Sequence, residues 1–255
     1  MLFLGFGAVR IGASCAGTRP ASCWRCSISR EVLFDLSVEY EQMLNQGIRL
    51  SGEGQEFFIR GRVESLKSRL PGGLKVRRIL DFGCGIGTSA RHLGEQFEKA
   101  EVVGVDTSEN ALSYATDKWG SDRLRFLGMD ALDSEKDFDL CYVNGVFHHI
   151  EPVDRAEAVR KIYGALRSGG RFALFENNPW NPGARMVMQR IPFDRDAKML
   201  SVPNAVRLLR VGGFGGTVSR WSLFYFPRLL APLRFLEGAL SHLPLGAQYC
   251  VLADK

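Results

Sequence analysis

Residues 79–88 of the chain read Ile79-Leu80-Asp81-Phe82-Gly83-Cys84-Gly85-Ile86-Gly87-Thr88. The apolar residues at the beginning of this stretch are typical of a buried strand, and a helical pattern begins at Thr88. The three glycines between them permit a tight turn and allow a ligand to come close to the backbone. We therefore predict a strand, a glycine-rich loop and a helix, with a ligand bound at the loop.

Short β-type runs alternate with helical runs after this loop. Strands are predicted at residues 77–82, 101–105, 124–129, 138–143 and 171–175, and helices at 88–97, 110–118 and 154–166. Such alternation indicates right-handed crossovers and a parallel sheet with helices on both faces. The predicted fold class is therefore α/β.

The segments on either side of this region are less regular. Two helices are predicted before residue 70, and the three prolines of residues 178–196 favour a loop. A helix at 202–211, a strand at 217–226, an apolar helical stretch to residue 243 and a last strand at 248–253 follow. We expect the two late strands to complete the same sheet.

The net charge of +5 lies almost entirely in residues 1–30. This leader contains four arginines and no acid, whereas residues 31–255 carry 29 basic and 28 acidic side chains. Its apolar run is too short to form a membrane helix. The composition of the segment is typical either of a transit peptide or of a beginning of the chain that takes no part in the fold. The near-neutral remainder disfavours a nucleic-acid partner, because tracking phosphates requires clustered Lys or Arg.

The cysteines favour a reducing, cytoplasmic location without disulfides. Cys23 and Cys26 have the spacing of metal ligands, but no second Cys or His pair lies near them. Cys84, Cys141 and Cys250 are scattered in apolar surroundings, as is typical of buried small hydrophobic residues. We expect no metal site.

The glycine spacing and a preceding acid narrow the ligand chemistry. The loop reads G-x-G-x-G, not the dinucleotide pattern G-x-G-x-x-G, and Asp81 would repel a pyrophosphate. An acid there suits a ligand that presents an ammonium group, such as the methionine part of S-adenosylmethionine, whose carboxylate would meet backbone N–H donors. Asp106 and Asp130 follow at the ends of the next two strands. Asp106 can accept hydrogen bonds from ribose hydroxyls, and Asp130 can accept one from an adenine amino group.

These residues resemble the class I S-adenosylmethionine-dependent methyltransferase family. Asp81 to Gly87 is similar to its first motif, and residues 144–149, Asn-Gly-Val-Phe-His-His, to its fourth. The resemblance implies a Rossmann-like, doubly wound sheet of seven strands, mostly parallel with an antiparallel last strand. It also implies S-adenosylmethionine as cofactor. The implied donor-binding residues are Asp81, Gly83, Cys84, Gly85, Gly87, Asp106, Thr107, Asp130, Ala131 and Asn144.

The same resemblance divides the folded part of the chain. We expect a single domain at residues 31–255, made of cap helices at 31–73, a donor-binding core at 74–177 and an acceptor side at 178–255. The catalytic candidates follow the fourth and fifth strands and are His148, His149 and Glu176. The aromatic and basic residues Phe57, Phe58, Arg60 and Arg62 of the second helix could close over the donor site.

The reaction class is left with alternatives. A methyl transfer to a small-molecule or lipid-linked acceptor is expected, with O-methylation favoured over N- or C-methylation. Enzymes that methylate nucleic-acid amines carry an Asn/Asp-Pro-Pro-aromatic run after the fourth strand, and residues 144–147 lack it. A nicotinamide-dependent oxidoreductase and a non-catalytic binding module are the rival hypotheses.

The apolar stretch at residues 223–243 has two interpretations. It contains five leucines at helical spacing beside Arg228 and Arg234, and three prolines argue against a membrane span. It forms either part of the core or an exposed surface that lies against a membrane or a second subunit. A peripheral membrane contact through this stretch would suit a lipid-linked acceptor; the oligomeric state stays open.

Overall fold

The structure is a computed structural model that describes residues 37–191, 194–195 and 197–255. The predicted leader at residues 1–30, including Cys23 and Cys26, lies outside the described residues. Within them, Cys84, Cys141 and Cys250 are buried free thiols, as the sequence predicted.

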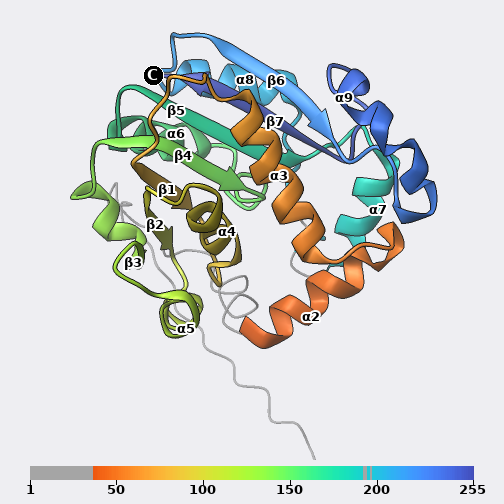
Figure 1. The fold of residues 1–255 in the computed structure, drawn as a ribbon, viewed down its shortest axis with the longest axis horizontal. Coiled ribbons are helices and arrows are strands. Elements are labelled where there is room, and N and C mark those ends of the chain that lie inside the picture. Colours follow the sequence, from red (N-terminus) through yellow and green to blue (C-terminus); the bar gives the residue numbers. More distant parts are fainter. Residues whose placement is uncertain (1–36, 192–193, 196) are drawn as a thin grey trace, which may run out of the picture.

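A seven-stranded sheet forms the centre of the described part of the chain (Figure 1). Its spatial order is β3-β2-β1-β4-β5-β7-β6, and β7 alone runs in the direction opposite to the other six strands. The predicted sheet is therefore confirmed, including the two late strands. The strands are β1 (Arg78–Phe82), β2 (Glu101–Asp106), β3 (Leu124–Gly128), β4 (Phe138–Asn144), β5 (Leu166–Asn177), β6 (Val218–Leu223) and β7 (Gln248–Asp254).

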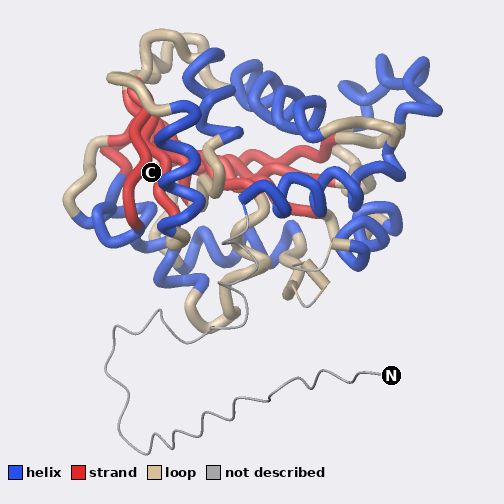
Figure 2. The backbone as a smooth tube through the Cα atoms, turned by 90° about the horizontal axis from the view of Figure 1, so that it is seen from below, coloured by secondary structure: helices blue, strands red, loops and turns tan. Residues whose placement is uncertain are grey.

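Helices cover both faces of the sheet, as Figure 2 shows. Adjacent residues of a strand point to opposite faces, so Ile79 and Leu80 of β1 belong to two separate apolar clusters. Helices α3 (Gln55–Arg69) and α4 (Thr88–Gln96) pack on the face of Ile79, with Trp119 of α5 (Glu109–Trp119) beside them. Helices α6 (Arg155–Ala165) and α8 (Val202–Val211) pack on the face of Leu80.

The parallel strands end at one edge of the sheet. Asp81 of β1 is in register with Gly104 of β2, and Asp106 of β2 with Gly128 of β3. The carboxyl ends of β1 to β4 therefore meet where a ligand of an open α/β sheet is expected. The short helix η2 (Met129–Asp133) continues from β3 at this edge.

One prediction outside the sheet is wrong. Residues 178–196 were expected to form a loop, but they contain helix α7 (Pro182–Arg190). Proline is well suited to the first turn of a helix, where its missing N–H is not needed, and the side chain of Asn181 accepts a hydrogen bond from the Ala184 N–H. Two residues that suggested a loop thus begin a helix. Helix α2 (Ser37–Ile48) contacts α7 and leads through η1 (Arg49–Ser51) to α3.

The apolar stretch after β6 is largely exposed. It forms η3 (Arg228–Leu236), which is interrupted at Leu230 and contains Pro232, and α9 (Glu237–Leu240), and neither contains a buried residue. Leu229 is 90% exposed and Phe235 is 78% exposed. The Glu237 carboxylate anchors the stretch because it accepts hydrogen bonds from two backbone N–H groups before η3. No helix in the described ranges has both the length and the apolar character to cross a bilayer.

Candidate functional site

A cavity of about 600 Å³ opens at the carboxyl ends of the parallel strands. The glycine loop after β1 and the loop after β4 form one side of it. Helices α2, α3 and α7 and the segment after β6 form the other. The cavity therefore joins the predicted donor loop to elements that are distant from it in the sequence.

The glycine loop turns sharply at the end of β1. The N–H groups of Gly83 and Cys84 both donate to the Val105 carbonyl of the neighbouring strand, at 2.8 and 3.0 Å. Gly85 has a φ of +52°, and no atom lies within 4 Å of the position that a Cβ would occupy there. A side chain at this position would therefore project into open space beside the cavity, where glycine instead leaves the backbone accessible.

Asp81 is a buried carboxyl without a partner. Its Oδ2 has no hydrogen bond, and the side chain lines the cavity. Burial raises the pKa of Asp81 to about 8; the charge of Asp106 adds to the shift, and the charge of Arg62 opposes it. A carboxyl in this state gains most from a cationic ligand, because such a ligand would compensate the cost of burying its charge.

Asp106 holds the glycine loop from the next strand. Its Oδ2 accepts from the Gly85 N–H at 2.8 Å and its Oδ1 from the Ser108 N–H at 3.0 Å. Burial raises the pKa of Asp106, and these backbone N–H groups partly offset the effect. Asp106 therefore adjoins the loop without itself lining the described cavity.

The predicted donor residues divide into two groups. The cavity is lined by Asp81, Gly83, Cys84, Gly85 and Asn144. The others lie outside its lining, at the same edge of the sheet: Gly87, Asp106, Thr107, Asp130 and Ala131. Asn144 ends β4, and its side-chain oxygen is buried without a hydrogen-bond partner, so it offers a second acceptor to a ligand.

His148 connects the cavity to a buried acid. Its Nδ1 lies 2.6 Å from Glu176 Oε2, and Glu176 Oε1 accepts the Phe147 N–H at 2.8 Å. Burial would lower the pKa of His148, but the carboxylates of Glu176 and Asp194 outweigh it and raise this pKa to about 10. Glu176 is 1% exposed and does not line the cavity, so it can act on a ligand only through His148.

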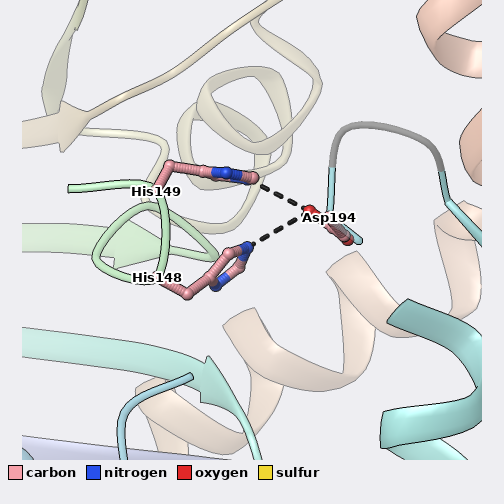
Figure 3. A group of neighbouring side chains, drawn as sticks. All are labelled: His148, His149 and Asp194. Atoms are coloured by element: carbon pink, nitrogen blue, oxygen red, sulfur yellow. Dashed lines mark hydrogen bonds and ion pairs between the residues drawn. The ribbon is translucent and has the colours of Figure 1, made fainter. Parts of the chain in front are cut away.

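His148 and His149 share Asp194, which is the second carboxylate partner of His148. Figure 3 shows both imidazoles directed at Asp194, which comes from the segment after α7. Asp194 Oδ1 lies 3.3 Å from His148 Nε2 and 3.1 Å from His149 Nε2. Burial lowers the pKa of His149, whereas hydrogen bonds from both histidines overcome burial and lower the pKa of Asp194 to about 2.

The comparisons with known proteins agree with this geometry. Residues 79–170 match the model of a family described as a methyltransferase domain. Trans-aconitate 2-methyltransferase of Rhodopseudomonas palustris (strain BisB5) is 26% identical over 121 residues, which are 48% of this chain and 46% of the relative. Demethylmenaquinone methyltransferase of Thermus thermophilus is 34% identical over 124 residues, or 47% of this chain and 56% of the relative.

A solved structure extends the likeness beyond the matched segment. A SAM-dependent methyltransferase from Archaeoglobus fulgidus superposes with a TM-score of 0.61 at 18% identity, over 79% of this chain and 95% of that one. Residues 79–170 therefore match a methyltransferase domain, and the described part of the chain has the fold of a solved S-adenosylmethionine-dependent methyltransferase. The chain spans about half the length of the curated relatives it matches, and residues 171–255 lie beyond the family model.

Sequence reasoning missed two parts of the candidate site. Asp194 stands in a segment whose prolines suggested only a loop, 45 positions after His149, and no local pattern marks it. The role of Arg62 was only partly foreseen: it is buried, lines the cavity, and donates to Tyr142 Oη at 3.1 Å and to Gln248 Oε1 at 2.9 Å.

The other three residues named in the second predicted helix, which is α3, lie on two different faces of it. Phe57 and Phe58 line the cavity beside Phe224, with ring centroids 5.8 and 4.9 Å from that of Phe224. Arg60 points away from the cavity; it is exposed and lies 4.0 Å from Glu64 one turn later. Three of the four residues named from the sequence therefore line the cavity, and Arg60 does not.

Proposed function

We propose that this methyltransferase binds S-adenosylmethionine at the glycine loop and transfers its methyl group to a small molecule in the adjoining cavity. The observation that carries the proposal is Asp81, a buried carboxyl without a partner at the wall of the cavity. A dinucleotide would bring a pyrophosphate to the same place and meet repulsion, so the oxidoreductase hypothesis is the weaker one.

The side chains present fit the donor. Asp81 would accept hydrogen bonds from the ammonium group in the methionine part of S-adenosylmethionine, and Asn144 Oδ1 offers a second hydrogen-bond acceptor nearby. Asp106, which fixes Gly85, lies at the end of β2 and would accept hydrogen bonds from the ribose hydroxyls; Asp130, in η2 directly after β3, would accept one from the adenine amino group. When bound, the cofactor supplies a methyl group on a sulfonium, and the sulfur keeps the bonding electron pair when the methyl group leaves.

The acceptor side mixes apolar and polar walls. Phe57, Phe58 and Phe224 contribute rings, while His148 and His149 contribute polar atoms. Such a site favours positioning a compact, largely apolar acceptor, and orientation is the main aid that a methyl transfer needs. We assign acceptor contact to the two histidines and positioning of His148 to Glu176. A polar group beside the acceptor supports O-methylation, in which a hydroxyl must lose its proton.

The exposed apolar stretch supports delivery of the acceptor from a lipid surface. Pro227 and Arg234 line the cavity, and the exposed Leu229 and Phe235 lie on the same short stretch of chain. An acceptor that is linked to lipid would then reach the cavity without leaving the interface. The named relatives act on different compounds, trans-aconitate and demethylmenaquinone by their descriptions, and so leave the acceptor open.

Calorimetric titration with S-adenosylmethionine tests the donor proposal. We expect binding to the wild-type chain and to Asp122→Asn, an exposed acid on the turn before β3, and a large loss in Asp81→Asn. Absence of heat with the wild type at millimolar ligand would overturn the proposal, and a fluorescence titration with NADH would then test the oxidoreductase. Binding of the donor without product from any acceptor panel would favour the non-catalytic module.

A further inference from the structure

We propose that His148, His149 and Asp194 together bind one divalent transition-metal ion, whose open coordination positions take an oxygen of the acceptor. The role in acceptor binding rests on the proposed methyl transfer, but the metal site itself does not. The sequence led us to expect no metal, because the metal-like spacing of Cys23 and Cys26 has no second Cys or His pair near it, and Asp194 lies 45 positions after His149. The fold brings them together at the cavity (Figure 3).

The distances between the ligand atoms fit a single ion. Asp194 Oδ1 lies 3.3 and 3.1 Å from the two imidazole Nε2 atoms, and one ligand atom of each residue lies within 4.8 Å of the other two. Nitrogen and oxygen ligands at about 2.0–2.2 Å from an ion are separated from each other by about 3.0–3.5 Å in tetrahedral or octahedral sites. The two distances from Asp194 Oδ1 therefore lie within the range for ligands of one ion.

The groups behind His148 prepare it as a ligand. Its Nδ1–H donates to Glu176, and Glu176 is itself held by the Phe147 N–H, so the other ring nitrogen faces Asp194. The Lys198 N–H donates to the His148 carbonyl at 2.9 Å and ties the loop after β4 to the segment that carries Asp194. A carboxylate behind a histidine ligand is a common support of metal sites, because it fixes the ring and increases its basicity.

The open side of the cluster faces the acceptor. All three residues line the cavity, whereas Glu176 lies behind them, so the remaining positions of an ion are directed to the space that a substrate enters. Two histidines and one carboxylate with open positions suit Zn²⁺, Fe²⁺, Co²⁺ or Mn²⁺ better than Mg²⁺ or Ca²⁺, which prefer oxygen ligands. The substrate class is thus a hydroxyl compound, best with a second oxygen beside the hydroxyl.

The chemical role follows from the charge of the ion. A hydroxyl bound to a divalent ion has a lowered pKa and releases its proton to water. The resulting oxygen supplies the electron pair of the new O–C bond, while the C–S bond of the sulfonium breaks and its pair stays on sulfur. The products are a methyl ether or ester, the neutral thioether and one proton, so the step is balanced without an oxidant or reductant.

Titration of the chelator-treated full chain with Co²⁺ tests the site. A Cys15→Ser/Cys23→Ser/Cys26→Ser background removes the three leader thiols, so visible absorption without thiolate charge-transfer bands reports nitrogen and oxygen ligands. We expect one ion per chain, displaced by Zn²⁺, with His149→Ala and Asp194→Asn at least 10-fold weaker. Glu176→Gln is expected to bind 10- to 100-fold more weakly. The exposed His242→Ala should be unchanged and controls for adventitious surface binding.

The same samples are titrated with S-adenosylmethionine, which separates this proposal from the proposed function. Donor binding without a one-to-one Co²⁺ spectrum would overturn the metal site and leave the donor site in place. Co²⁺ binding that is equally strong in wild type, His149→Ala and Asp194→Asn would also overturn it. The Co²⁺ spectrum without donor binding would support the metal site and contradict the proposed function. Variants that keep donor binding are shown to be folded by that measurement.

Discussion

The donor end and the acceptor side of the cavity are built in different ways. The donor end uses backbone groups and acids that lie within residues 81–144, at the ends of consecutive parallel strands. The proposed acceptor side uses His148 and His149 of the loop after β4 together with side chains from α2, α3 and α7 and from the segment after β6. The family model matches residues 79–170, so it covers the first and, apart from the two histidines, leaves out the second.

This difference shows where the two sides can vary. A peptide N–H is present whatever the residue, so the glycine loop needs only small residues and two or three acids to work. The acceptor side depends on the identity of each side chain, and its helices can change without disturbing the sheet. The methyl donor can therefore be inferred from the family, whereas the acceptor has to be inferred from the side chains that line the cavity.

The largest expected effect concerns the acceptor side. Glu176→Ala removes the buried partner of His148 and of the Phe147 N–H, and we expect a loss of about 3–5 kcal/mol of unfolding free energy. Urea denaturation measures it, with the exposed Glu157→Ala as control. The affinity for S-adenosylmethionine should stay within twofold of the wild type. A fall in affinity as large as the fall in stability would show that the two sides are not independent.

Asp81→Asn tests the donor end in the opposite sense. Loss of a charge-assisted contact of about 1.5–3 kcal/mol should weaken donor binding about 10- to 150-fold. The folded-state pKa of about 8 lies above the unfolded value, so the carboxyl costs stability at any pH above about 4, and increasingly up to about pH 8. Without ligand, the variant should therefore have a higher melting temperature than the wild type at pH 8, and the difference between the two melting temperatures should be smaller at pH 5. An unchanged or lower melting temperature at pH 8 would contradict the assignment.

The affinity for the donor should depend on pH through Asp81. Only the ionised carboxyl attracts an ammonium group, so binding should strengthen about tenfold per unit as the pH rises from 6 to 7, and level off near 8. Above pH 8 the α-amino group of the ligand loses its own charge and the affinity should fall. Calorimetry at four pH values measures the profile. In the Asp81→Asn variant the affinity should not rise between pH 6 and 7. An equal rise in the variant would show that another group causes the pH dependence.

The smallest effect on the folded protein is expected from the exposed stretch. A Leu229→Asp/Phe235→Asp variant should change the unfolding free energy by less than about 0.5 kcal/mol, because both side chains are already in water. It should abolish flotation with phosphatidylcholine and phosphatidylglycerol vesicles, while Val153→Asp, which is 85% exposed in another loop, should not. Wild-type protein that does not float with vesicles would remove lipid delivery from the proposal.

The donor end could be predicted from the sequence because its signals are local. The glycine spacing, Asp81 and the strand-end acids stand beside the elements that position them, and the structure places them at one edge of the sheet. Helix α7 was missed because its prolines resemble a loop signal until Asn181 is seen to cap it. Asp194 could not be found because its partners, His148 and His149, meet it only through the tertiary fold.

Strand β7 lies between β5 and β6, although it follows β6 in the chain. During synthesis the outermost strand therefore emerges first and has no neighbour to pair with until residues 248–254 have left the ribosome. The five strands from β3 to β5 can assemble earlier, because the pairings among them involve only residues before 178. The nascent protein thus completes its glycine loop first, and the wall at Phe224, which continues from β6, is ordered last.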